Sequence, residues 1–181
     1  MAQRLARVNV LVCRLCAIGA GGTMAGVFSI IFVNALRRYT IGKSFEWGEE
    51  LPIYLAIYGV MFGSALAYLQ DRHVRFTLFI DFLSGRARNH VFAAVDLAVA
   101  AAGAVLTWSG LLLVQRRGDI EAAGLIGPAK ELARQTGLGW IEAVGHLAAW
   151  QSAVCLGGIL LAVASILKFV DRLSAPPGPE S

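Results

Sequence analysis

Four long runs of apolar residues, separated by short polar segments, dominate the hydrophobic pattern of this chain. The runs cover about 15–36, 51–70, 94–115 and 143–167. About 20 apolar residues in a helix are enough to cross the ~30 Å hydrocarbon core of a bilayer. The pattern therefore predicts an all-α integral membrane protein with four transmembrane helices, in a single domain over 1–173.

The composition excludes a lone soluble globule. Of the 181 residues, 57% are hydrophobic and 15% are charged, whereas a soluble domain has about 25% charged residues. A chain of this size buries only about 70% of its surface on folding, so one small core cannot hold the apolar excess. The Pro-rich segment 174–181 is expected to be a disordered tail.

The distribution of Lys and Arg predicts the orientation. If both termini are cytoplasmic, the inner segments carry nine basic residues and the outer segments seven. Arg4, Arg7 and Arg14 before the first run decide this small difference in favour of cytoplasmic termini. A cleaved signal peptide is the less favoured alternative, because the apolar run after Arg14 is too long. The net charge of +4 fits contact with anionic headgroups and no nucleic-acid partner.

Small residues recur at helical spacing within the runs. Gly22 and Gly26 lie four residues apart in the first run, and Gly59, Gly63 and Ala67 repeat that spacing in the second. Such stripes let membrane helices approach closely. They suit packing within this four-helix bundle, and they also suit docking onto a larger membrane protein.

Three titratable residues near the ends of the runs are candidates for chemistry. Asp96 is expected near the N-terminus of the third helix, with Arg88 and His90 close by, as a structural anchor rather than a proton relay. Glu142 and His146 are four residues apart, which predicts a local ion pair on one helix face or a contact to a partner.

The chain carries no recognisable set of catalytic or ligand-binding residues. It has no Ser-His-Asp arrangement, no glycine-rich phosphate loop and no metal-ligand cluster. A membrane haem would need two histidines on facing helices, and only His146 lies inside a run. We therefore expect no enzyme activity, no cofactor and no metal site.

The segment before the second run predicts a short interfacial helix. Ser44 is a potential cap, Glu46 suits a helix N-terminus, and Trp47 suits the membrane interface. Pro52 disfavours helical backbone at the residue before it, so we expect one to two turns near 45–50, a bend, and then the spanning helix.

Two adjacent acids in this segment, Glu49 and Glu50, need partners at the depth of the interface. The basic residues Arg37, Arg38 and Lys43 lie nearby in the sequence. A charge-balanced loop is the simple interpretation of this arrangement.

The segment 34–74 resembles the small permease subunit of tripartite ATP-independent periplasmic (TRAP) transporters, the DctQ-like family. The order and spacing follow that family's R-Y, W-x-E-E, G-x-A and H-[IV] pattern. The residues that carry the resemblance are Asn34, Arg38, Tyr39, Trp47, Glu49, Glu50, Gly63 and His73.

The resemblance implies a subunit of a larger system in the bacterial cytoplasmic (inner) membrane. A periplasmic substrate-binding protein captures an organic acid, a large multi-span permease subunit carries it with an ion gradient, and the small subunit is a scaffold that helps docking. The residues named above would then be structural or subunit contacts. Two alternatives remain open at this point: a membrane anchor for a redox complex, and a small autonomous carrier.

Overall fold

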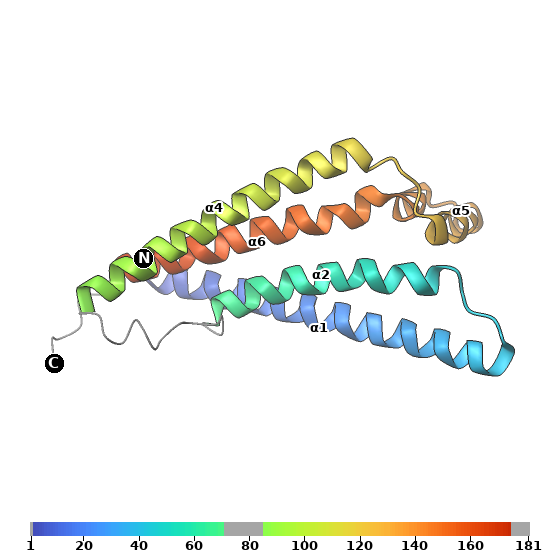
Figure 1. Cartoon of the computed structure of the whole chain (residues 1–181), viewed down its shortest axis with the longest axis horizontal. Helices are drawn as coiled ribbons and strands as arrows, with labels where there is room; N and C mark the ends of the chain where they lie inside the picture. Colours follow the sequence, from blue (N-terminus) through green and yellow to red (C-terminus); the bar gives the residue numbers. More distant parts are fainter. Residues whose placement is uncertain (1, 71–84, 175–181) are drawn as a thin grey trace.

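The computed structural model describes residues 2–70 and 85–174, and this part of the chain is built from helices (Figure 1). The elements are α1 (Ala2–Ile41), α2 (Trp47–Leu69), α4 (Gly85–Arg117), α5 (Ala123–Thr136), a 3₁₀ helix η1 (Gly139–Gly145) and α6 (Leu147–Ser174). Four of them, α1, α2, α4 and α6, are long and apolar enough to cross a membrane. Among the described residues, β pairing is limited to one isolated bridge. The all-α membrane class predicted from the sequence is confirmed.

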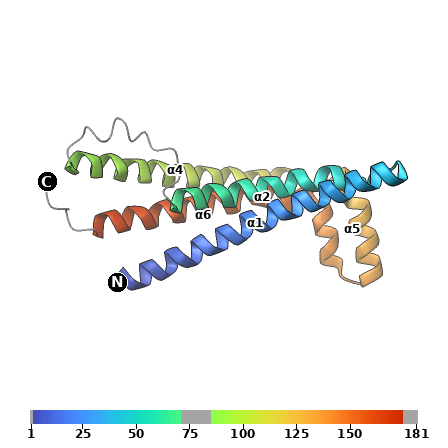
Figure 2. The same cartoon turned by 90° about the horizontal axis from the view of Figure 1, so that it is seen from below.

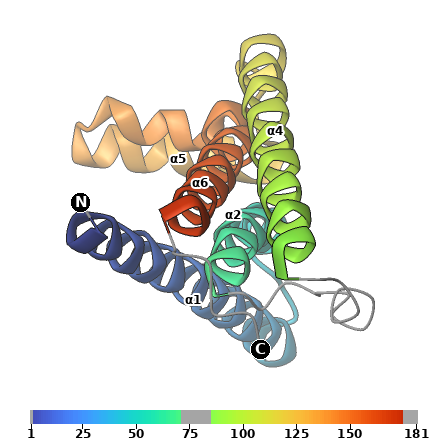
Figure 3. The ribbon, with the colours of Figure 1, turned by 90° about the vertical axis from the view of Figure 1, so that its left-hand side faces the viewer.

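The four long helices form two pairs that meet along α2 and α6. Helix α1 packs on α2, α4 packs on α6, and α2 contacts α6 between them (Figures 1 and 3). Because successive helices run in opposite directions, the N-terminal end of α1 and the C-terminal end of α6 lie at the same end of the bundle (Figure 1). We call this the terminal end, and the other the loop end.

Glycines let the backbones of α4 and α6 touch. A Cβ atom at Gly103 would lie 2.7 Å from the backbone nitrogen of Ala162, and one at Gly110 would lie 2.6 Å from that of Cys155. Neither backbone can move away without moving its helix. Small residues therefore set the spacing of this pair, as is usual for helices that associate in lipid.

The predicted small-residue stripes are used only in part within the chain. A Cβ at Gly59 would lie 2.5 Å from the Met24 methyl carbon, so the absence of a side chain here lets α1 pack closely on α2. At Gly22 and Gly63, by contrast, a Cβ would meet nothing within 4 Å. Those two positions have room for another molecule.

The predicted interfacial helix and bend before the second span are wrong. One helix, α2, runs from Trp47 through Pro52 to Leu69. Proline is the sixth residue of this helix, where it removes only the hydrogen bond to the carbonyl of Gly48, one turn back. The residue before the helix is Glu46, which makes no capping side-chain bond. The first turn instead carries the negative charges of Glu49 and Glu50, which interact favourably with the helix dipole.

The start of the fourth span also differs from the prediction. The run 143–167 does not form one helix, because η1 ends at Gly145 and His146 has extended backbone before α6 begins at Leu147. At its other end, α6 continues to Ser174, and the rest of the predicted tail, 175–181, lies outside the described residues.

Helix α5 and η1 form a hairpin that the hydrophobic runs did not reveal. The chain reverses after Thr136 through Gly137, whose φ of +71° favours glycine. Figure 2 shows this hairpin standing out sideways from the long axis of the bundle at the loop end. Leu125 and Ala129, one turn apart, are its buried apolar side chains.

Candidate functional site

The connection between α1 and α2 is held by one side chain from α1. The side-chain oxygen of Asn34 accepts a hydrogen bond of 2.7 Å from the backbone N–H of Phe45. The same side chain lies against Gly48, where an added Cβ would come within 2.7 Å of its Cγ. Asn34 therefore fixes both the loop and the first turn of α2. We call Asn34, Phe45, Gly48, Glu50 and Gly124 the loop cluster.

Aromatic and cationic side chains cover the loop cluster. The Arg37 guanidinium lies 3.7 Å from the ring centroid of Phe45, and the Phe45 and Trp47 rings stack with centroids 4.9 Å apart. The Phe45 ring thus contacts a cation and also Trp47, the residue predicted to lie at the membrane interface, and both residue types are common there.

The two acids of the motif have different partners, and neither has the predicted ion pair. Glu50 accepts a hydrogen bond of 3.2 Å from the backbone N–H of Gly124, in the first turn of α5. The α5 N-cap residue, Ala122, makes no side-chain cap, so Glu50 of α2 supplies a missing acceptor. The Ser44 hydroxyl donates to Glu49 over 3.4 Å.

The basic residues expected beside these acids are engaged elsewhere or exposed. Arg37 lies over the ring of Phe45 instead, and Arg38 is exposed. Tyr39 beside it is 92% exposed. Together with the open Gly63, these motif residues are free to meet another molecule. His73, the last residue of the motif, lies outside the described residues.

A second polar group, at the terminal end of the bundle, joins three helices. Asp96 of α4 is only 2% exposed, and its Oδ2 lies 2.6 Å from Nε of Arg172 on α6. The hydroxyl of Tyr68 on α2 donates to its other oxygen. Lys168 lies 5.4 Å from the ring centroid of Tyr68, and Arg172 lies 4.6 Å from that of Phe92. We call these five residues the charged cluster.

The expected position and partners of Asp96 are both corrected. Helix α4 begins at Gly85, so Asp96 lies three turns inside it rather than near its N-terminus. Its partners are Tyr68 and Arg172, not the residues one or two turns earlier on its own helix. A charge this far from the helix end gains little from the dipole, so a buried acid there needs a cation from a neighbouring helix.

Glu142 and His146 do not share a helix face, because η1 ends between them. His146 instead forms a β bridge with Glu121, and its ring Nδ1 lies 3.3 Å from the carbonyl oxygen of Asp119. Lys130 of α5 forms an ion pair of 2.8 Å with Glu121. The hydrogen bond from Lys130 lowers the pKa of Glu121 and, in turn, raises the pKa of the ammonium group. These contacts hold the base of the α5–η1 hairpin.

Some residues of both clusters were not anticipated. Tyr68, Arg172 and Gly124 supply the partners of Asp96 and Glu50. The one signal for Arg172 is that two cations, Lys168 and Arg172, follow the fourth run, which an antiparallel hairpin brings beside the acid at the start of the third. No three His, Cys, Asp or Glu side chains gather as a metal site in the described residues.

A comparison with protein-family models agrees with the resemblance seen in the motif. Residues 27–175 match the family model described as "Tripartite ATP-independent periplasmic transporters, DctQ component". That segment takes in the loop cluster, the charged cluster, the α5–η1 hairpin and all of α2 and α4. A comparison with curated proteins finds no match for this sequence.

Proposed function

Because the chain belongs to the DctQ component family of TRAP transporters, we propose that it is the small scaffold subunit of a binding-protein-dependent uptake system. The system would be a symporter that takes up organic acids on an ion gradient. In it, this subunit holds the large multi-span permease subunit and helps to dock the periplasmic substrate-binding protein. The family match over 27–175 carries this proposal.

The surface of the bundle supports a scaffold role. Helices α1 and α4 occupy the outer positions of the bundle (Figure 3). Both expose large apolar side chains along their length. Phe28 and Phe32, both more than half exposed, stack on the outside of α1. A bundle of this size leaves room for lipid on some of these faces and for a large membrane partner on others.

We assign the partner contact to the outer face of α1 and the open part of α2. Arg38, Tyr39 and Gly63 belong to the family motif, yet none has a partner of its own among the described residues. In contrast, Asn34, Trp47 and the two acids shape the loop end from within. In this proposal Arg38, Tyr39 and Gly63 bind the large subunit. The residues at the loop end hold α1 and α2 in the relative position that this contact surface needs.

We place the protein in a bacterial cytoplasmic (inner) membrane with both termini in the cytoplasm. Four spans bring the termini to one side, and the arginines near the N-terminus favour the inside. The α5–η1 hairpin then lies on the periplasmic side. Its exposed Leu138 and Trp140 would sit where a binding protein or the outer headgroups approach.

Co-purification tests the proposal most directly. The full chain would be coexpressed with a candidate large permease subunit from the same genome, extracted in mild detergent, and captured by a tag on this chain. We expect a stable complex, and proteoliposomes that hold both subunits should take up substrate only when the binding protein and an ion gradient are present.

Two variants locate the contact. Tyr39→Ala and Gly63→Leu should weaken capture of the large subunit, because one removes an exposed ring and the other fills an open position. Trp108→Ala, at a 66% exposed residue of α4, is the matched control and should capture normally. Extraction of this chain as a monomer in the presence of the large subunit, or uptake by this chain alone, would contradict the scaffold proposal.

A further inference from the structure

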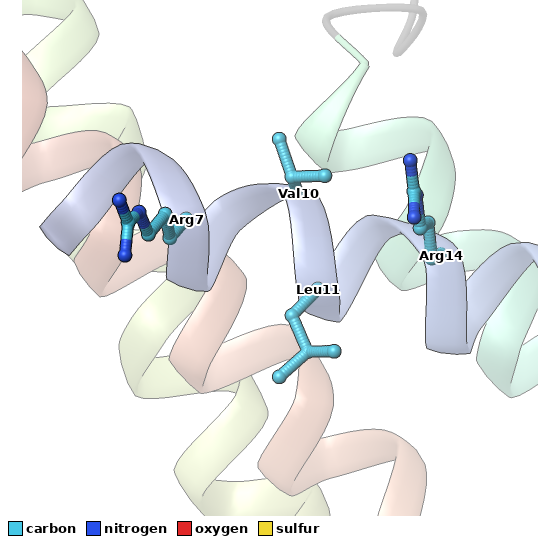
Figure 4. A pocket seen from close by; sticks show the side chains of 4 residues that line it. All are labelled: Arg7, Val10, Leu11 and Arg14. Atoms are coloured by element: carbon cyan, nitrogen blue, oxygen red, sulfur yellow. The ribbon is translucent and has the colours of Figure 1, made fainter. Parts of the chain in front are cut away.

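A groove on α1 near the terminal end combines two cations with apolar side chains. It is lined by Arg7, Val10, Leu11 and Arg14, and its volume is about 380 Å³. Figure 4 shows Val10 and Leu11 between the two arginines along the helix. Both arginines are exposed, and the two apolar side chains are 53% and 58% exposed. From this geometry we propose that the groove binds an anionic phospholipid, with the guanidinium groups on its headgroup phosphate.

The depth of the groove fits the headgroup layer. Arg14 and Arg37 lie 23 residues apart on α1, which is about 34 Å along a helix at 1.5 Å per residue. That distance matches the ~30 Å hydrocarbon core, so the two arginines mark its two edges. Arg7 lies two turns outside Arg14, about 10 Å farther along the helix, in the layer that holds the phosphates.

The charge of the groove calls for an anion. Neither Arg7 nor Arg14 has a carboxylate within ion-pair distance in the part of the chain that the structure describes. At the same end of the bundle, Arg172 is already paired with Asp96. The positive charge on α1 therefore faces outward without compensation, and a lipid phosphate supplies the bidentate acceptor that a guanidinium prefers.

The apolar part of the groove distinguishes a lipid from a free anion. Val10 and Leu11 lie between the arginines and offer a surface for glycerol and acyl carbons next to the phosphate. A small inorganic anion would leave this surface in water. The inference requires only that α1 crosses a bilayer, so its failure would leave the proposed scaffold function untouched.

The test measures lipid binding to the full chain in detergent by native mass spectrometry. Phosphatidylglycerol and phosphatidylcholine with the same acyl chains are added separately, and inorganic phosphate is a third probe. We expect a clear preference for phosphatidylglycerol. The double variant R7Q/R14Q should lose about fivefold in affinity per arginine, from ~1 kcal/mol per basic residue at a membrane surface converted at 1.4 kcal/mol per tenfold. Its phosphatidylcholine binding should not change.

Control variants separate this groove from general charge. R116Q/R117Q removes two exposed arginines at the loop end and should keep the preference. L11A should weaken binding of phosphatidylglycerol while phosphate binding stays the same. If the double variant fails to insert, R14Q alone is measured instead, because it keeps most of the charge before the first span. It should show about half of the loss in phosphatidylglycerol affinity on a logarithmic scale.

Three results would overturn the proposal. One is equal loss in R7Q/R14Q and R116Q/R117Q, which would mean attraction by net charge alone. The second is binding of inorganic phosphate as tight as that of the lipid. The third is an unchanged lipid preference together with weaker capture of the large permease subunit, which would mean that these arginines bind a protein.

Discussion

The ion pair between Asp96 and Arg172 should hold three helices together, and its two members should contribute unequally. The carboxylate is 2% exposed, whereas the side chain of Arg172 is 25% exposed. Removing one partner of a buried pair costs about 3–5 kcal/mol when the remaining charge stays buried. After Asp96→Asn, the arginine can still reach water. After Arg172→Gln, the carboxylate cannot, although the Tyr68 hydroxyl still donates to it.

This asymmetry sets the expected magnitudes. We expect R172Q to lower the free energy of unfolding by about 3 kcal/mol, the lower end for a buried charge, because one hydrogen bond remains. D96N should lower it by about 1.5–2 kcal/mol, at the lower end of the range for a hydrogen bond to a charged group, because the bond from the Tyr68 hydroxyl then goes to a neutral acceptor. In the double variant no charge is left unpaired, so the two losses should not add, and the coupling energy should exceed about 1 kcal/mol.

The assay is equilibrium unfolding of the full chain in mixed micelles, followed by the fluorescence of its four tryptophans. The matched control is the exposed pair Arg134 and Glu131, which lie 2.9 Å apart with side chains 79% and 50% exposed. Its coupling energy should be about 0.5 kcal/mol or less. The reasoning is refuted if the Asp96–Arg172 coupling is no larger than this control, or if D96N is the more damaging single change.

Three further predictions concern other parts of the fold. Glu50→Ala should speed amide hydrogen exchange in α5 by about fivefold, from ~1 kcal/mol for a lost helix cap, and exchange as slow as in the wild type would exclude that role. Gly103→Val should lower the free energy of unfolding by about 1–3 kcal/mol, because the new side chain collides with the backbone of α6. Gly21→Val is the control and should leave this free energy unchanged, because a Cβ there meets nothing within 4 Å. The Glu121–Lys130 pair should protect the base of the hairpin near neutral pH. Because the pKa of Glu121 is lowered, that protection is lost as pH falls below its ordinary value of 4.5 and through the lowered one. Glu121→Gln should abolish this pH dependence of hydrogen exchange, and a dependence that survives would point to another group.

Much of this protein follows from local chemistry that the sequence carries by itself. Long apolar runs must become helices in lipid, because unpaired backbone groups cannot be left in hydrocarbon. The number of spans and the all-α class could therefore be predicted from hydropathy alone. The motif from Asn34 to Gly63 could also be identified, because it depends only on residue order, and its family is confirmed by the match over 27–175.

Helix ends were less predictable. Apolar character continues from Ala143 into α6, but the backbone changes at Gly145 and His146, where η1 ends and the chain pairs with Glu121. A hydropathy average over neighbouring residues cannot detect pairing with a segment some 25 residues earlier in the chain. The hairpin that contains α5 was also missed, because its buried face is small and its cap comes from Glu50 on another helix.

The tertiary structure decided which charges meet. The sequence showed that Asp96 needed a partner, but the nearest basic residues in the chain are not the ones that reach it. Close contact at Gly103 and Gly110 fixes how α4 sits against α6, and that contact brings Arg172 to the carboxylate. Partner choice thus depends on the rotation and spacing of whole helices, which are set by packing along their full length and not by any local pattern.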